Sequence, residues 1–229
     1  MWLAGNSGPF RVHNLEVGSP RASGLRILHI SDLHFAPGQK AKQQFLKELA
    51  DLKPDLVINT GDNLGHKDAI NPTLRALEPL LDFPGVFVNG SNDYRAPKPR
   101  NPIRYFTGPS KVQAGQALDT DRFMRELVGA GWQDINNKSA RLDIRGKSLG
   151  FMGLDDPHDH LDDLESLGQQ AAEIANADLT IGVAHAPYMR VIDALLENHA
   201  SLMFAGHTHG GQICLPGQKA LVTNCDLPT

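Results

Sequence analysis

The sequence is poor in cysteine and in basic charge, and it has no long apolar run. Its 229 residues include two cysteines, Cys214 and Cys225, which are too few for a disulfide framework or a cysteine-rich zinc site. No stretch reaches the roughly eighteen apolar residues that a membrane-spanning helix needs, and residues 1–10 lack the pattern of a signal peptide. The net charge of -4 provides no basic field, which disfavours nucleic acid as an obligate partner.

What the chain does have is enough apolar material for one core. Hydrophobic residues make up 41% of the sequence, and a chain of this length can bury a sizeable core as a single domain. We therefore expect one domain over residues 1–229, with residues 1–24 as an N-terminal extension. The expected location is cytoplasmic, or membrane-associated in the full-length protein.

Strand and helix patterns alternate along the chain. Apolar runs rich in β-branched residues predict buried strands at 25–30, 56–60, 86–89, 179–184 and 202–205. Helical patterns lie at 40–52, 74–81, 122–128, 162–174 and 188–196. Two further strand-like segments, 142–144 and 149–152, flank a turn at 145–147. This order predicts an α/β sandwich, in which a second, partly antiparallel sheet packs on a parallel one.

Five short clusters of metal-binding residue types punctuate this pattern. They are Asp32-Leu33-His34, Gly61-Asp62-Asn63, Gly90-Ser91-Asn92-Asp93, His185, and Gly206-His207-Thr208-His209-Gly210. Four of them follow a predicted strand, and ligands of open α/β sheets bind at the carboxyl ends of strands. Imidazole, carboxylate and amide groups together suit a borderline divalent ion. The clusters therefore predict one site in a metal-dependent hydrolase.

In this order the clusters resemble the five motifs of the calcineurin-like metallophosphoesterases, over about residues 25–212. The segments 27–34 and 206–212 resemble the bacterial phosphodiesterase-like branch of that superfamily, whose members are often membrane-associated. The resemblance implies a four-layer αββα sandwich of two mixed sheets flanked by helices. It also implies that the C-terminal part of the family fold is missing after residue 212.

The resemblance further implies two divalent or trivalent metal ions, which would be Mn, Fe or Zn. Asp32, His34 and His209 would hold one ion, His185 and His207 the other, and Asp62 would bridge them. A hydroxide shared by the ions would attack a phosphate ester, with a phosphodiester favoured. Asp62 and His185 thereby also count as catalytic residues.

The fourth cluster departs from the family pattern. The family usually has Gly-Asn-His followed by Asp or Glu, with Asn on the metal and His assisting the leaving group. Aligned without a gap, Ser91 replaces the Asn and Asn92 the His; shifted by one residue, Asn92 is the ligand and Asp93 the assisting group. We favour Asn92 as the ligand, because an amide oxygen coordinates a divalent ion better than a neutral hydroxyl does.

Neither alignment leaves an imidazole in the fourth motif, so another donor is of interest. His66, His158 and His160 are candidates, and each also fits an ordinary loop position. We further predict that Asn63 and Arg95, together with His66, contact substrate. Arg95 begins the basic, proline-rich segment 95–104, which fits either a lip for an anionic substrate or a solvated loop.

The expected partner is a small phosphorylated substrate, which could be lipid-linked or held at a membrane surface. Two other functions remain open. A degenerate relative could bind metals as a scaffold without turnover, and a dinuclear amide hydrolase would share the metal chemistry. The choice among metals, the preference for monoester or diester, and the oligomeric state stay open at this point.

Overall fold

The computed structural model describes residues 10–18, 24–97, 115–208, 213–215, 219–222 and 225–227. Its first sheet has the order β1-β2-β3-β4, and every pairing in it is parallel. The strands are β1 (Ile27–Ile30), β2 (Leu56–Asn59), β3 (Gly85–Phe87) and β4 (Gln133–Asp134). The prediction of two mixed sheets therefore needs a correction here, because the described part of this sheet is parallel throughout.

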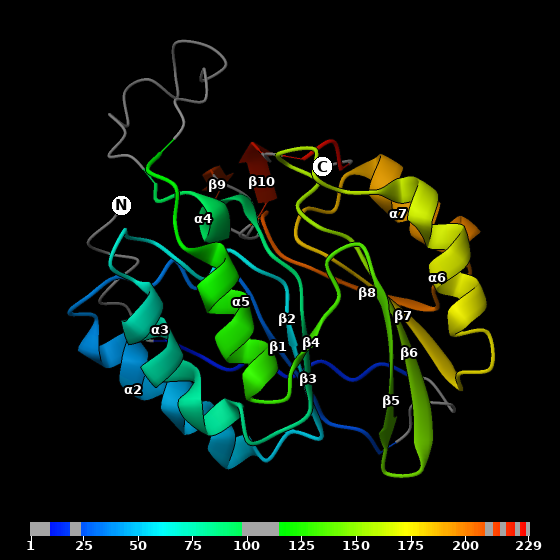
Figure 1. Ribbon diagram of the computed structural model, residues 1–229, viewed down its shortest axis with the longest axis horizontal. Coiled ribbons are helices and arrows are strands. Elements are labelled where there is room, and N and C mark those ends of the chain that lie inside the picture. The colour runs from blue at the N-terminus through cyan, green and yellow to red at the C-terminus, as the bar shows by residue number, and fades with distance from the viewer. Residues whose placement is uncertain are drawn as a thin grey trace.

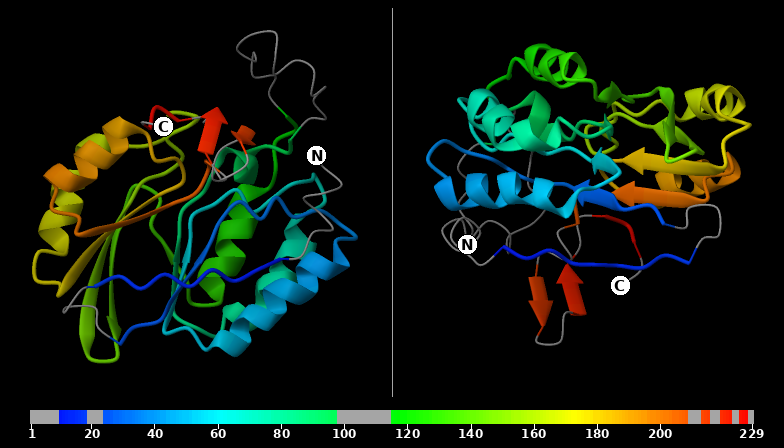
Figure 2. Two further views of the ribbon diagram at one scale, coloured as in Figure 1. Left: turned by 180° about the vertical axis from the view of Figure 1, so that it is seen from behind. Right: turned by 90° about the horizontal axis from the view of Figure 1, so that it is seen from below.

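The second sheet has the order β5-β6-β7-β8 and is mixed. Strands β5 (Ser139–Ile144) and β6 (Lys147–Gly153) form the predicted antiparallel hairpin. Strands β7 (Leu179–Ala184) and β8 (Leu202–Ala205) then add in parallel to β6. A separate antiparallel pair, β9 (Ile213–Leu215) and β10 (Lys219–Val222), projects to one side of the layers (Figure 2).

Helices cover the outer face of each sheet, which gives the four layers visible in Figure 1. The first sheet is covered by α2 (Lys40–Glu48), α3 (Ile70–Leu77) and α5 (Thr120–Gly129), where α2 continues into a 3-10 turn at Leu49–Leu52 and α3 into one at Glu78–Leu80. The second sheet is covered by α6 (Leu167–Glu173), preceded by a 3-10 turn at Leu164–Ser166, and by α7 (Met189–Glu197). The prediction of a four-layer sandwich is thereby confirmed.

The core divides into layers because side chains alternate along the strands. In β2, Leu56 and Ile58 pack between the two sheets, whereas Val57 packs against the helices of the first sheet. In β6, Phe151 faces the other sheet and Met152 faces the outer helices. The sheets therefore bury both faces, and their loops are free to build a site at the edge where the strands end.

Candidate metal centre

Five of the six predicted ligands that the structure describes lie in loops leaving the carboxyl ends of four strands. Asp32 and His34 follow β1, Asp62 follows β2, His185 follows β7 and His207 follows β8. Ligand atoms of Asp32, Asp62 and His185 all lie within 4.8 Å of one another. Both sheets therefore contribute to one cluster, as the convergence of strand ends predicts.

Asp62 is the centre of this cluster and is buried. Its Oδ2 lies 3.7 Å from Nε2 of His34 and 3.5 Å from Nε2 of His185. The backbone nitrogen of Asn92 donates to Oδ1 at 2.8 Å, and the side-chain Nδ2 of Asn92 lies 2.6 Å from Oδ2. One carboxylate therefore meets groups from three separate loops.

His185 is oriented by a backbone carbonyl of the opposite sheet. Its Nδ1 lies 2.8 Å from the carbonyl oxygen of Thr60, and its Nε2 lies 3.3 Å from Nδ1 of His207. A carbonyl partner fixes the proton on Nδ1 and leaves Nε2 as the nitrogen for a metal ion. The Thr60 contact is thus a positioning interaction of the kind that metal-binding histidines make.

Asp32 is held by the loop after β8. Its Oδ2 accepts a hydrogen bond from Oγ of Ser31 at 2.5 Å and from the backbone nitrogen of His207 at 2.9 Å, while Oδ1 lies 3.8 Å from Nε2 of His34. Gly206 packs so closely that a Cβ there would stand 2.5 Å from Asp32 Oδ2. The first and fifth motifs are therefore packed directly against each other.

Four of the predicted ligands have left-handed backbone conformations. The φ angles are 53° at Asp32, 40° at His34, 55° at Asp62 and 67° at His207. Non-glycine residues rarely adopt positive φ, and such strain concentrates at functional sites where the surroundings enforce it. The backbone of this cluster is therefore shaped for its side chains at a local energetic cost.

Burial and charge act strongly on the ionisable groups of the cluster. Burial alone would raise the pKa of Asp62, but His185 and His34 hold it well below its ordinary value. Burial alone would lower the pKa of His185, but Asp62, Asp32 and Asp156 raise it to about 10. Burial lowers the pKa of His207 to about 4, with His185 and His158 adding to the effect. Without a metal ion, protonated His185 balances the buried Asp62 carboxylate.

The fourth motif forms the short helix α4 (Ser91–Tyr94). Asn92 faces the cluster through its contact with Asp62, whereas Asp93 is fully buried. The Asp93 carboxylate accepts hydrogen bonds from the backbone nitrogens of Asn63, Leu64 and Gly90 at 2.8, 3.2 and 3.1 Å. This burial suits a positioning role for Asp93 better than the leaving-group role predicted from the sequence.

The three predicted substrate contacts lie in different surroundings. Asn63 is buried, where its side chain accepts from Asn59 at 2.9 Å, so it orients the loop instead of facing a substrate. The exposed His66 lies 3.6 Å from the carboxylate of Asp68. Arg95, half exposed at the other end of α4, lies 3.6 Å from Asp159.

His158 lies nearer to the cluster than the acidic turn around it indicated. Its ring centroid stands 4.7 Å from that of His207, and its Nδ1 lies 2.8 Å from Oη of Tyr188. The turn follows β6 as the other clusters follow their strands. This position after a strand is the sequence feature that could have placed His158 near the site. The neighbouring His160 is exposed.

Two predicted elements of the site lie outside the described residues. They are His209, the second histidine of the fifth motif, and residues 98–104 of the basic segment.

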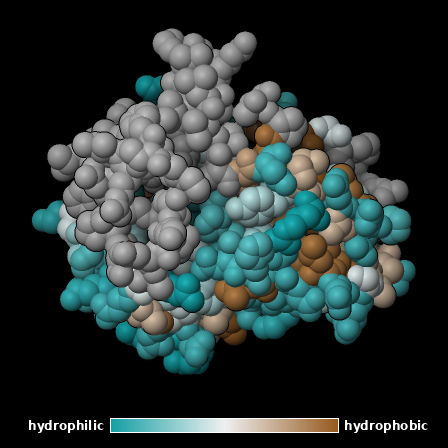
Figure 3. Space-filling model, turned by 90° about the horizontal axis from the view of Figure 1, so that it is seen from above, coloured by the Kyte–Doolittle hydropathy of each residue, from teal (hydrophilic) through white to brown (hydrophobic). Residues whose placement is uncertain are grey.

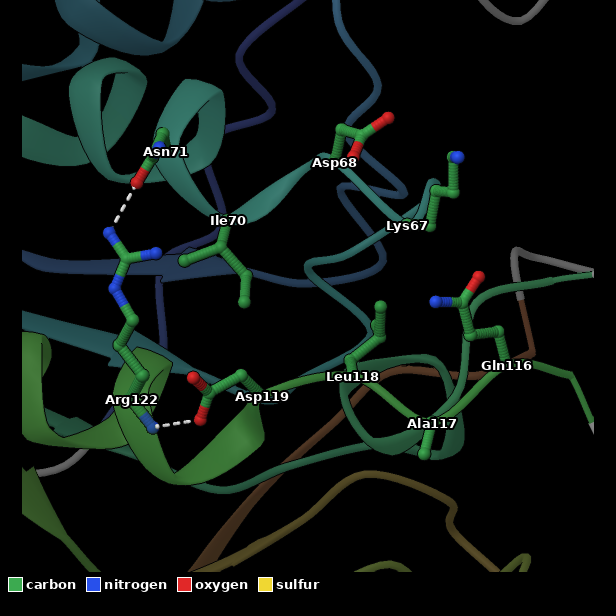
Figure 4. Close-up of a pocket in the computed structure, with 9 residues that line it drawn as sticks. All are labelled: Lys67, Asp68, Ile70, Asn71, Gln116, Ala117, Leu118, Asp119 and Arg122. Atoms are coloured by element: carbon green, nitrogen blue, oxygen red, sulfur yellow. Dashed lines mark hydrogen bonds between the residues drawn. The ribbon is translucent and has the colours of Figure 1, made fainter.

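A hollow of about 330 Å³ between α3 and α5 is separate from this cluster (Figure 4). Within it, Nη2 of Arg122 donates to Oδ1 of Asn71, and the backbone nitrogen of Arg122 donates to Asp119. None of its lining residues is a predicted metal ligand. They are Lys67, Asp68, Ile70, Asn71, Gln116, Ala117, Leu118, Asp119 and Arg122.

The fold and the cluster together define an α/β sandwich with a candidate metal site at the carboxyl ends of its strands. Residues 25–211 match the calcineurin-like phosphoesterase family, and the chain belongs to that family. The resemblance read from the five motifs is therefore confirmed. The donor set also fits metal ions, because its carboxylates and imidazoles suit borderline divalent ions.

Several known proteins are similar to this chain. The uncharacterized metallophosphoesterase YkoQ of Bacillus subtilis is 26% identical over 209 residues, which cover 90% of this chain and 68% of YkoQ. A transmembrane protein with a metallophosphoesterase domain from Danio rerio is 22% identical over 204 residues, which cover 83% of this chain and 41% of that protein. The purple acid phosphatase PPD1 of yellow lupin shares the fold, with a TM-score of 0.52 and 14% identity over 81% of this chain and 38% of that one.

Among the described residues, no helix combines the length and apolar character needed to cross a bilayer. Some relatives are nonetheless named transmembrane proteins.

Proposed function

We propose that the protein is a dinuclear metal-dependent phosphoesterase that prefers phosphodiesters. The observation that carries this proposal is the position of Asp62 Oδ2 between two imidazoles, 3.7 Å from His34 and 3.5 Å from His185. The two histidines come from different sheets, so a carboxylate between them suits a ligand that bridges two ions.

Each ion would have its own set of ligands from this chain. Asp32, His34 and His209 would hold one, and Asn92, His185 and His207 the other. Mn, Fe and Zn all accept such a set. When bound, two such ions activate a water molecule and neutralise charge on the phosphoryl oxygens.

The chain's own contribution is to hold these groups in place before substrate binds. Asn92 fixes the Asp62 carboxylate, Thr60 orients His185, and the His207 backbone nitrogen holds Asp32. Partners of this kind commonly change metal affinity or activity by about ten- to a hundredfold when they are removed.

The preference for diesters follows from charge and from the fourth motif. Asp93 and Asp156 are buried beside the cluster, and burial raises the pKa of each to about 7, so together they carry part of a negative charge at neutral pH. That charge opposes a dianionic monoester more than a monoanionic diester. The fourth motif also lacks an imidazole to assist a poor leaving group.

The substrate we propose is a small phosphorylated molecule, lipid-linked or free. Figure 3 shows the end of the molecule where the carboxyl ends of the strands lie. The coloured surface there is mostly hydrophilic, with small apolar patches. A charged headgroup suits such a surface. The transmembrane relatives support a substrate at a membrane.

The test is hydrolysis of bis-p-nitrophenyl phosphate and p-nitrophenyl phosphate by protein stripped of metal and reloaded with Mn. We expect faster turnover of the diester, and a loss of more than about a hundredfold in Asp62→Asn. The matched control is Asp51→Asn, an exposed carboxylate in the 3-10 turn after α2, which should behave as wild type. Two bound ions without turnover would support a metal-binding scaffold instead. Cleavage of amide substrates but of neither phosphate ester would support an amide hydrolase.

A further inference from the structure

The proposed phosphoesterase site lacks an imidazole in its fourth motif, and a histidine from another loop lies beside it. We propose that His158 is a substrate-binding residue of this site, donating a hydrogen bond from Nε2 to a phosphoryl oxygen. The inference rests on the proposed function. Its geometric basis is the 4.7 Å between the ring centroids of His158 and His207.

Hydrogen bonds and an ion pair hold the turn that carries His158. The backbone nitrogen of His158 donates to Oδ1 of Asp156 at 3.0 Å, and the carbonyl oxygen of Pro157 accepts from Nη2 of Arg190 at 2.9 Å. Arg190 also forms an ion pair with Asp162 at the other end of the same turn. The imidazole is therefore positioned before a substrate arrives, which reduces the entropic cost of a binding contact.

Tyr188 contacts the Nδ1 edge of the His158 ring. Its Oη lies 2.8 Å from Nδ1, and the two rings are nearly parallel, with 5° between their planes. In the proposed arrangement the hydroxyl donates to Nδ1, so a neutral imidazole carries its proton on Nε2, on the opposite edge of the ring.

The other two candidate donors are less suitable. His160 is exposed on the same turn, and His66 is paired with Asp68 on an exposed stretch before α3. Neither has a ring contact with a predicted ligand among the described residues, whereas His158 has one with His207. Because His160 shares the turn but lacks that contact, it serves as a control.

The experiment compares His158→Asn, His158→Gln and His160→Asn, each loaded with Mn. Asn keeps a polar atom near the Nδ1 position and removes Nε2, whereas the longer Gln restores an amide near the Nε2 position. We expect His158→Asn to weaken binding of inorganic phosphate, measured by calorimetry, and to lower kcat/KM for the diester, each by roughly tenfold to a hundredfold. His158→Gln should recover part of both, and His160→Asn should change neither.

Metal content separates this role from metal ligation. All three variants should bind as much Mn as wild type; loss of an ion in His158→Asn would make His158 a ligand and overturn the proposal. Equal losses in His158→Asn and His160→Asn would overturn it too, since the turn alone would then explain them. If wild type shows no turnover but His158→Asn still weakens phosphate binding, the proposed function fails while the role of His158 stands.

Tyr188 is a positioning residue in this scheme and is tested through His158. Tyr188→Phe should weaken phosphate binding in the wild-type background but cause no further loss when His158→Asn is already present. Additive losses in the double variant would show that the hydroxyl acts independently of His158, which would overturn its assigned role.

Discussion

Asn92 contacts both oxygens of the Asp62 carboxylate, through its backbone nitrogen to Oδ1 at 2.8 Å and through its side-chain Nδ2, 2.6 Å from Oδ2. Asn92 therefore lies beside the carboxylate proposed to bridge the ions, whereas the buried Asp93 does not suit the assisting role that the same alignment gives it, so Asn92 as the ligand stays a prediction. As a ligand, the amide would present Oδ1 in place of Nδ2, since the two ends of the group are nearly equal in shape.

Substitution of Asn92 should therefore affect the site more than substitution of its neighbour. We expect Asn92→Ala to weaken binding of one Mn ion and to lower diester hydrolysis, each by about ten- to a hundredfold. Ser91→Ala, one residue earlier in α4, should stay close to wild type. Metal titration and initial rates measure both, and the reverse order of effects would show that Ser91 is the ligand.

The proton on His185 predicts how the metal-free protein responds to alkaline pH. Asp62 raises the pKa of the folded imidazole to about 10, against about 6.5 in the unfolded chain. A raised pKa contributes stability that is fully present below the unfolded value and is lost as the pH rises through the folded value. The contribution of His185 to the free energy of unfolding of the metal-free protein should therefore fall between about pH 6.5 and about pH 10.

A bound metal ion takes the place of that proton, so the metal-loaded protein should lack this contribution. Urea unfolding at several pH values, with and without Zn, measures the difference. In His185→Gln the metal-free protein should also lose the contribution. Identical pH dependence in wild type and His185→Gln would show that the imidazole does not carry the proton.

The sequence was sufficient for most strands because buried strands have a distinct pattern. The run at 56–60 became β2 (Leu56–Asn59), and the turn at 145–147 does join β5 to β6. The sequence alone could not assign β7 and β8 to the second sheet, because their apolar runs resemble those of the strands in the first sheet. The edge strand β4 (Gln133–Asp134) is only two polar residues long and carries no pattern.

Prediction of the site from the sequence was limited for a similar reason. Asp32, Asp62 and His185 stand out because each follows an apolar strand. The position of His158 depends on Tyr188, thirty residues further along the chain. Such a contact between distant loops exists only in the folded protein, so the sequence left His158 among several candidates.

Asp93 should be a determinant of stability. Each of its oxygens accepts a backbone N–H, Oδ1 from Asn63 and Leu64 and Oδ2 from Gly90. Asp93→Asn puts an NH₂ group against donors whichever way the amide turns, so we expect it to cost about 1–3 kcal/mol. Denaturant unfolding measures this cost. Asp143→Asn on the exposed side of β5 is the control, expected within about 0.5 kcal/mol of wild type; an equally stable Asp93→Asn would contradict the positioning role.

Gly90 allows the fourth motif to approach the cluster, and a single methyl group should be enough to disturb it. A Cβ at Gly90 would stand 2.4 Å from Oδ1 of Asp62 and 2.8 Å from the His185 ring, two groups that cannot move without breaking their own contacts. Gly90→Ala should therefore destabilise the protein by about 1–3 kcal/mol and reduce the bound Mn.

Gly129 provides the matched comparison, because a Cβ there meets nothing within 4 Å at the end of α5. Gly129→Ala should leave Mn binding unchanged and be neutral or stabilising by up to about 1 kcal/mol, since alanine restricts the unfolded chain. Thermal unfolding and metal analysis of the two variants separate a general effect of an added methyl group from one at the site. If Gly90→Ala bound Mn like wild type, the close packing of the fourth motif on Asp62 would not be required for metal binding.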